Sequence, residues 1–168
     1  MRLSVRPARA GVAALMLFVV ACAEPVTPGI PNGASRVADD EVDTLAREHF
    51  SGATSSARVV VTTPEEWAAV WEWIYAPYTP KPALPAVDFA QSVVVVASLG
   101  ERSSGGYGID VEDVYRTDSE IVVELRETAP GSSCVVTAAL TQPVVAVRVP
   151  RGAGEITFVE RRSEQECS

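Results

Sequence analysis

Cysteine and histidine are the residue types here best suited to covalent or metal chemistry, and the sequence holds three cysteines and one histidine. A thiol at Cys134 activated by His49 could act as a nucleophile in acyl transfer. No pattern brings the two residues together, and a disulfide explains Cys134 more simply. A zinc site at His49 would need cysteine or carboxylate ligands at regular spacing, which the neighbouring sequence lacks. We therefore expect no catalytic residue, no metal site, no cofactor and no enzymatic activity.

Two other segments contain residue types suited to ion binding but lack the required context. The glycine-rich segment Ser103-Ser104-Gly105-Gly106 lies between two expected strands and has no lysine, unlike a phosphate-binding loop. The acidic run Asp39-Asp40-Glu41 lacks the ligand spacing of a calcium loop and is more simply a solvated charge run. With a formal net charge of -8, the chain is also too acidic for a nucleic-acid partner, whose binders carry a basic surface.

The amino-terminal segment has the layout of an export signal. Arg2, Arg6 and Arg9 come without an acidic residue and precede an apolar stretch from Ala10 to Ala21. This stretch is well short of the roughly 20 residues that a transmembrane helix needs. Residues 1–21 are therefore predicted to be a signal peptide, and their removal takes away three arginines, so the formal charge changes from -8 to -11.

The end of this segment, Val19-Val20-Ala21-Cys22, resembles the lipobox of bacterial lipoproteins. The resemblance implies a lipid on Cys22, cleavage before it and acylation of the new amine, for example by palmitate. The chain would then be held at the outer membrane or at the external face of the cytoplasmic membrane. Ala23, rather than aspartate, follows the cysteine and favours outer-membrane sorting. The alternative is a secreted protein cleaved after Ala21 at an ordinary site.

If Cys22 carries lipid, Cys134 and Cys167 are left as a pair in an oxidising compartment. We predict a disulfide between them, with free thiols as the alternative. The bridge would hold the C-terminal tail on the domain and stabilise the fold by about 2–4 kcal/mol.

The remaining sequence divides into a tether and one domain. Residues 22–40 contain Pro25, Pro28 and Pro31 and few large apolar side chains, so they are predicted to form a flexible tether. Residues 41–168 are long enough to bury one hydrophobic core and are predicted to form a single globular domain.

The clearest element of this domain is a helix. Thr63, Pro64 and Glu66 have the spacing of a capping box with proline at the first helical position. The following apolar residues recur at helical spacing and form one face: Trp67, Val70, Trp71 and Ile74. An aromatic face could bind a ligand, but packing on a sheet explains it better. Trp73 points off this face, and the helix is expected to end near Tyr75.

Strands account for most of the rest. The β-branched run Val93-Val94-Val95-Val96 predicts a central strand covered on both faces. Residues 107–111 and 121–125 alternate between apolar and other residues and predict an antiparallel hairpin with one polar face. Further strands are expected at 59–61, 135–140, 144–149 and 156–159. The fold class is therefore α+β, a mainly antiparallel β-sheet of about six or more strands with one amphipathic helix packed on it.

The order of these pieces, from about Leu45 to Val159, resembles the PrcB C-terminal family of envelope lipoproteins. The matching features are Trp67 and Trp71, Val87-Asp88-Phe89, the Val93 to Val96 strand, Gly100, Ser104-Gly105-Gly106-Tyr107, Pro130-Gly131, Thr141-Gln142-Pro143 and Val147. The family takes its name from an accessory lipoprotein of a surface protease complex. The resemblance implies a membrane-anchored, non-catalytic module that binds or stabilises an envelope protein, which in the founding case belongs to a protease complex.

The candidate interaction site is the turn Ser103, Ser104, Gly105, Gly106 and Tyr107. Its glycines let another backbone approach closely, and the tyrosine is an amphipathic anchor of the kind favoured at interfaces. Tyr107 is also in register with Ile109 and Val111, so it could equally face the core. A glycine-tyrosine turn between strands also occurs in chagasin-like cysteine-protease inhibitors. Inhibition of a protease by this turn is therefore the alternative function.

Overall fold

The computed structural model describes residues 29–152 and 154–167; the predicted signal peptide, Cys22 and the first part of the predicted tether lie outside them. The elements of the described residues, in chain order, are β1 (Ser35–Arg36), the 3-10 helix η1 (Asp39–Glu41), β2 (Asp43–Glu48), β3 (Ser56–Val61), α1 (Pro64–Ile74), β4 (Ser92–Leu99), β5 (Gly108–Arg116), β6 (Glu120–Pro130), β7 (Val144–Pro150) and β8 (Glu155–Gln165). No helix in this part of the chain has the length and apolar character needed to cross a membrane.

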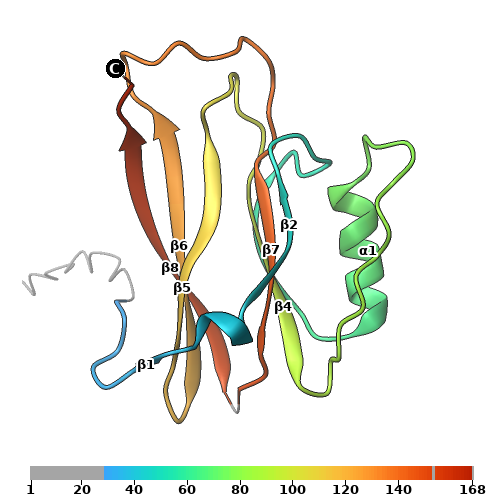
Figure 1. The fold of residues 1–168 in the computed structure, drawn as a ribbon, viewed down its shortest axis with the longest axis vertical. Helices are drawn as coiled ribbons and strands as arrows, with labels where there is room; N and C mark the ends of the chain where they lie inside the picture. Colours follow the sequence, from blue (N-terminus) through green and yellow to red (C-terminus); the bar gives the residue numbers. More distant parts are fainter. Residues whose placement is uncertain (1–28, 153, 168) are drawn as a thin grey trace, which may run out of the picture.

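The strands form two sheets that face each other (Figure 1). The first sheet has the order β1-β5-β6-β8, and the second has the order β2-β7-β4-β3. Paired strands are antiparallel in both sheets except for β6 and β8, which run parallel from Glu120 opposite Glu155 to Pro130 opposite Gln165. The α+β class with mainly antiparallel strands is confirmed. The strands are divided between two sheets because β4 carries apolar side chains on both faces, and each face needs its own cover.

The main hydrophobic core lies between the two sheets. It is formed by side chains at alternating positions of the facing strands, which point to the same side of each sheet. The buried residues include Val93, Val95, Ala97 and Leu99 of β4, Ile121, Val123 and Leu125 of β6, and Val145, Val147 and Val149 of β7. The hairpin predicted from residues 107–111 and 121–125 is the β5–β6 pair, and it supplies the inner face of the first sheet.

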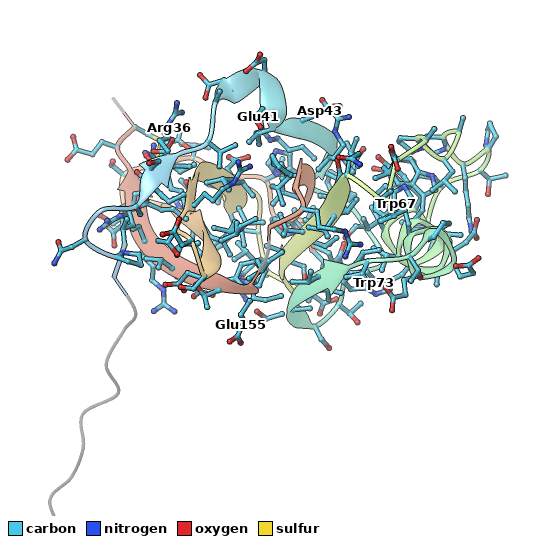
Figure 2. The ribbon with its side chains drawn as sticks, turned by 90° about the horizontal axis from the view of Figure 1, so that it is seen from below. Arg36, Glu41, Asp43, Trp67, Trp73 and Glu155 are labelled. Atoms are coloured by element: carbon cyan, nitrogen blue, oxygen red, sulfur yellow. A yellow bond between two sulfur atoms is a disulfide. The ribbon has the colours of Figure 1, made fainter. Side chains whose placement is uncertain are left out.

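Helix α1 covers the other face of the second sheet, so the molecule has three layers (Figures 1 and 2). Val94 and Val96 of β4 pack in the core on this side, and β4 is thus buried on both faces, as its β-branched run predicted. The predicted capping box is present: the Glu66 N–H donates to the Thr63 hydroxyl at 3.2 Å, and the Thr63 N–H donates to the Glu66 carboxylate at 3.2 Å.

The aromatic face of α1 packs against the sheet and beneath the proline-rich loop that follows the helix. Trp67 and Trp71 are buried, and their ring centroids lie 5.2 Å apart. Each indole N–H donates to a backbone oxygen of the loop at 3.0 Å, that of Trp67 to Pro85 and that of Trp71 to Pro82. The aromatic face is therefore part of the core, and Trp73, which lies off this face, is half-buried.

At the C-terminal end of α1, the carboxylate of Glu48 binds two tyrosines that continue the aromatic cluster. The Tyr75 and Tyr78 hydroxyls each donate a hydrogen bond to one oxygen of Glu48 at 3.0 Å. Burial, and next the hydrogen bond to Glu48, raise the pKa of Tyr75 above its ordinary value of 10.0. The folded state therefore holds the phenolic proton more tightly than the unfolded state does.

We expect the free energy of unfolding to fall as the pH rises above about 10. A group whose pKa is raised by folding contributes stability that is fully present below the unfolded pKa and is lost as the pH rises through the folded pKa. The fall should be shallower for Tyr75→Phe, which has no proton to lose at this position. Urea titrations between about pH 8 and pH 11 measure both slopes. Identical slopes for the two proteins would contradict this assignment.

Three parts of the fold differ from the sequence-based expectations, and the first is the end of the tether. Within the predicted tether 22–40, β1 pairs with Tyr115 and Arg116 at the end of β5. The Val37 N–H donates to the Val114 oxygen at 2.8 Å, and the Val37 side chain is buried in the main core. The predicted tether therefore ends before Ser35, because Ser35 and Arg36 pair with the edge of β5 and Val37 is buried in the main core.

The second and third differences concern strands. The strand expected at 135–140 is absent, and residues 131–143 form a loop that runs from the end of β6 to the start of β7 (Figure 1). Conversely, β2 was not predicted as a strand, since its sequence is largely polar. It forms because the edge of β7 offers a partner along Asp43–Glu48. The acidic run Asp39–Glu41 is an exposed turn of 3-10 helix.

Candidate functional site

The predicted interaction turn lies at one end of the sandwich, between the end of β4 and the start of β5 (Figure 1). Residues 101–107, which contain this turn, lie beside the loop 131–142, and Phe50 lies near both. We call these three parts together the turn-end surface. The opposite end carries the β5–β6 turn at residues 117–119. Figure 2 is seen from that opposite end.

The loop 131–142 is hydrogen-bonded along the turn. The Gly105 N–H donates to the Thr137 oxygen at 2.9 Å, and the Thr141 hydroxyl donates to the Ser104 oxygen at 2.8 Å. Arg102 and Thr141 exchange two backbone hydrogen bonds of 2.8 and 2.9 Å. The loop therefore belongs to the site. Its apolar segment 135–140 was predicted to be a strand, and no signal in the sequence shows that this segment is exposed beside the turn.

A disulfide attaches this loop to the end of β8. Cys134 and Cys167 are bonded, with their Cα atoms 5.0 Å apart, which confirms the predicted bridge. The Gly131 N–H also donates to the Gln165 oxygen at 3.0 Å. Since the sulfur of Cys134 is bonded to Cys167, it is not a free thiol that His49 could activate. Among the described residues, no group of three or more histidine, cysteine or acidic side chains could hold a metal ion.

Close packing of the turn against the loop requires glycine. Gly106 has a φ of +85°, a backbone conformation that other residues rarely adopt. A Cβ atom at this position would lie 2.8 Å from the Pro130 Cβ and 3.0 Å from the Val136 Cγ1. At Gly105 a Cβ would lie 2.5 Å from the Thr137 Oγ1. The two glycines thus let the turn lie against the loop.

Gly106→Ala is expected to lower the free energy of unfolding by about 1–3 kcal/mol, since it adds backbone strain and steric overlap. It should also expose the loop 131–142 to proteases, because the loop would have to move away. Gly108→Ala is the matched control, since the nearest atom to its added Cβ would be 4.0 Å away. Urea unfolding and limited proteolysis of the three proteins test this. Equal losses for both variants would show that the glycine conformation is unimportant.

Tyr107 is half-buried and packs against the main core, with part of its ring accessible at the end of the sandwich. The sequence left open whether Tyr107 is exposed or faces the core. In the structure the side chain does both in part: it packs against the core and is partly exposed. The guanidinium carbon of Arg102 lies 5.7 Å from the ring centroid, a distance typical of a cation–π contact. Tyr107 therefore links the core to the surface.

Two hollows adjoin the Tyr107 ring. One, of about 410 Å³, is bordered by Leu99, Arg102 and residues near the ends of β6 and β8. The other, of about 500 Å³, is bordered by His49, Phe50 and the glycines of the turn.

The turn-end surface also exposes most of the large apolar side chains that reach solvent in the described residues. Of the five exposed ones, four belong to this surface: Phe50 (53% exposed), Val135 (101%), Val136 (37%) and Leu140 (57%). The fifth, Leu84, lies in the loop over α1. Apolar groups concentrated at one end, beside two hollows, are typical of a protein-binding surface.

Part of the chain matches a known protein family. Residues 93–150, from β4 to β7, match the model of the family described as PrcB C-terminal. The matched segment includes the interaction turn, the loop 131–142 and Cys134, and it confirms the predicted resemblance over residues 93–150. Trp67, Trp71 and Val87-Asp88-Phe89, which also carried the resemblance, lie outside the match. No curated protein and no solved structure matches the chain.

Proposed function

Because residues 93–150 match the PrcB C-terminal family, we propose that this chain is a membrane-anchored accessory module that binds and stabilises another protein of the cell envelope without catalysing a reaction. The turn-end surface is the proposed binding site. The observation that supports this proposal is the exposure of Phe50, Val135 and Leu140 at the end of the sandwich that carries the turn, where Phe50 also borders a hollow beside Tyr107. A component of a surface protease complex is the proposed partner, by analogy with the protein that gave the family its name.

The interaction turn lies far from the point where the predicted tether enters the domain, which supports the turn-end surface as a protein-binding site. β1, which follows the predicted tether, pairs with the last residues of β5. The interaction turn precedes the first residue of β5, and β5 is nine residues long. At about 3.3 Å per residue, the turn lies roughly 30 Å from the point where the tether enters the domain. With a lipid on Cys22, the turn-end surface would lie at the end of the domain opposite the tether, where neighbouring proteins can reach it.

The alternative function, a protease-inhibitor wedge, has less support. A wedge must project from the domain so that it can enter a substrate cleft. Here the turn is hydrogen-bonded to Thr137 and Thr141, and Tyr107 packs on the core. A broad surface formed by a turn and a loop is better suited to docking on a partner than to insertion.

Site-specific crosslinking in intact cells tests the proposed binding site. A photoreactive amino acid at Leu140 should capture an envelope protein, because this side chain is 57% exposed within the turn-end surface. The matched control is the same group at Leu84, which is 46% exposed but lies over α1. Capture of the same proteins from both positions, or no capture from Leu140, would reject the turn-end surface as the binding site.

Cell fractionation tests the proposed anchor. The unaltered chain is expected in the membrane fraction, and Cys22→Ser is expected to leave it, because the lipid has no other attachment point. An unaltered chain found free and unacylated outside the cell would contradict the proposal. The crosslinking result from Leu140 is read separately, since binding and anchoring lie in different parts of the chain.

A further inference from the structure

We propose that the turn-end surface recognises an acidic side chain of its protein partner, and that Arg102 is the residue that binds this carboxylate. The inference rests on the proposed function and specifies the chemistry of the partner at the same site. Three observations support it: Arg102 has no acidic partner among the described residues, its position is fixed by contacts with Thr141 and Tyr107, and the one carboxylate in the adjoining hollow is already paired.

Arg102 has no acidic partner within the described residues, although the sequence contains 22 acidic residues and 14 basic ones. Eight other arginines of the described part lie within 4.0 Å of a carboxylate: Arg36, Arg47, Arg58, Arg116, Arg126, Arg148, Arg161 and Arg162. Arg151 instead donates to the backbone oxygens of Phe89 and Thr62. The side chain of Arg102 makes one hydrogen bond, of 3.3 Å, to the Glu101 oxygen. Since a guanidinium has five N–H donors, most of those of Arg102 remain available.

The position of Arg102 is nevertheless well defined. Its backbone exchanges two hydrogen bonds with Thr141, and its guanidinium lies over the Tyr107 ring. A side chain held in this way loses little conformational freedom when it binds a ligand. Its planar group can also bind both oxygens of a carboxylate at once, which a lysine cannot do.

The hollow beside Arg102 fits an acidic side chain. Leu99 and Ala129 form apolar parts of its wall, and Thr128 carries a hydroxyl group that can donate to a carboxylate, whereas the Ser163 hydroxyl donates to the Glu127 backbone oxygen at 3.4 Å. The wall also contains Glu127, but this carboxylate is already bound by Arg58 at 2.8 Å and by Arg162 at 3.3 Å.

Arg58 also pairs with Glu160 at 2.8 Å, so Arg58 and Arg162 together balance the charges of Glu127 and Glu160. Glu127 therefore already has partners and does not compete for Arg102. The remaining positive charge at Arg102 is complementary to a carboxylate on the partner. The apolar part of the wall can accept the methylene groups of an aspartate or glutamate side chain.

Selection from a library of random linear peptides on the immobilised full chain tests this inference. Peptides enriched by the unaltered chain should contain aspartate or glutamate. Arg102→Gln should weaken the binding of a selected peptide by about 10- to 100-fold, the effect of losing a hydrogen-bonded charge pair. Replacing the peptide's acidic residue by its amide should have the same effect. The two changes together should cost little more than either one.

Arg126→Gln is the matched control, because it removes the same charge from the outer face of the first sheet, where Arg126 pairs with Glu112. This variant should bind the peptides as the unaltered chain does. Thermal unfolding should show that both variants are folded. The inference is overturned if no peptide is enriched, if the enriched peptides lack acidic residues, or if Arg102→Gln binds them unchanged.

Crosslinking from Leu140 in the Arg102→Gln variant separates this inference from the proposed function. Reduced capture of the envelope protein supports both. Undiminished capture leaves the proposed function intact and rejects the role of Arg102. Capture of a second copy of this chain in place of an envelope protein would reject the proposed partner.

Discussion

Trp67→Ala is expected to lower the free energy of unfolding by about 3–5 kcal/mol, the usual cost of removing a buried tryptophan. The Trp67 side chain is 1% exposed and contacts Trp71 within the layer between α1 and the second sheet. The change would leave a cavity and deprive the Pro85 oxygen of its hydrogen bond from the indole. Small domains have a total stability of about 5–15 kcal/mol, so the variant should be close to unfolding. Urea denaturation followed by tryptophan fluorescence and circular dichroism measures the change.

Trp73→Ala provides the comparison, because it removes the same side chain from the same helix. Trp73 is only half-buried, and its loss should cost clearly less. Similar losses for the two variants would contradict the arrangement in which Trp67, rather than Trp73, joins the helix to the sheet. The comparison also accounts for helix propensity, since both variants place alanine within α1.

Removal of the disulfide by the double substitution Cys134→Ser and Cys167→Ser is expected to lower the free energy of unfolding by about 3–4 kcal/mol. The bridge joins residues separated by 33 positions, and a closed loop of that length restricts the unfolded chain by about this amount. The effect should extend to function, since the bridge attaches the loop 131–142 to β8. Crosslinking from Leu140 to the envelope partner should weaken together with the stability.

Reduction of the unaltered chain is the control for this prediction. A reductant should destabilise the unaltered chain by the same amount and leave the double variant unchanged. Mass mapping without reductant should recover the peptides of Cys134 and Cys167 joined together. Recovery of two free thiols, or an unaltered chain whose stability does not respond to the reductant, would show that the bridge is absent in the cell.

The features that the sequence predicted correctly depend on neighbouring residues. The start of α1 is determined by Thr63, Pro64 and Glu66, which lie within four positions, and the capping bonds form inside that segment. The hairpin of β5 and β6 is predicted by alternation on either side of a short turn. The β-branched run of β4 indicates burial on both faces, because such a run has no polar side to expose to water.

The features that the sequence did not predict depend on partners far along the chain. The segment 135–140 is as apolar as a strand, but a strand needs an edge with which to pair, and this loop crosses between the sheets instead. β2 shows the reverse case, since its polar sequence becomes a strand because β7 lies beside it. The predicted tether, which extended to residue 40, was too long for the same reason: Ser35 and Arg36 pair with the edge of β5 to form β1.

The candidate site shows the same division. The glycine turn and its tyrosine could be recognised from residue types alone, and the pairing of Cys134 with Cys167 could be predicted once Cys22 was assigned to the lipid. The three-dimensional fold was needed to show that the loop 131–142 lies along the turn, that Tyr107 is half-buried and that Arg102 has no acidic partner among the described residues. These properties depend on which groups meet across distances of many residues, and local preferences of the chain carry no information about such meetings.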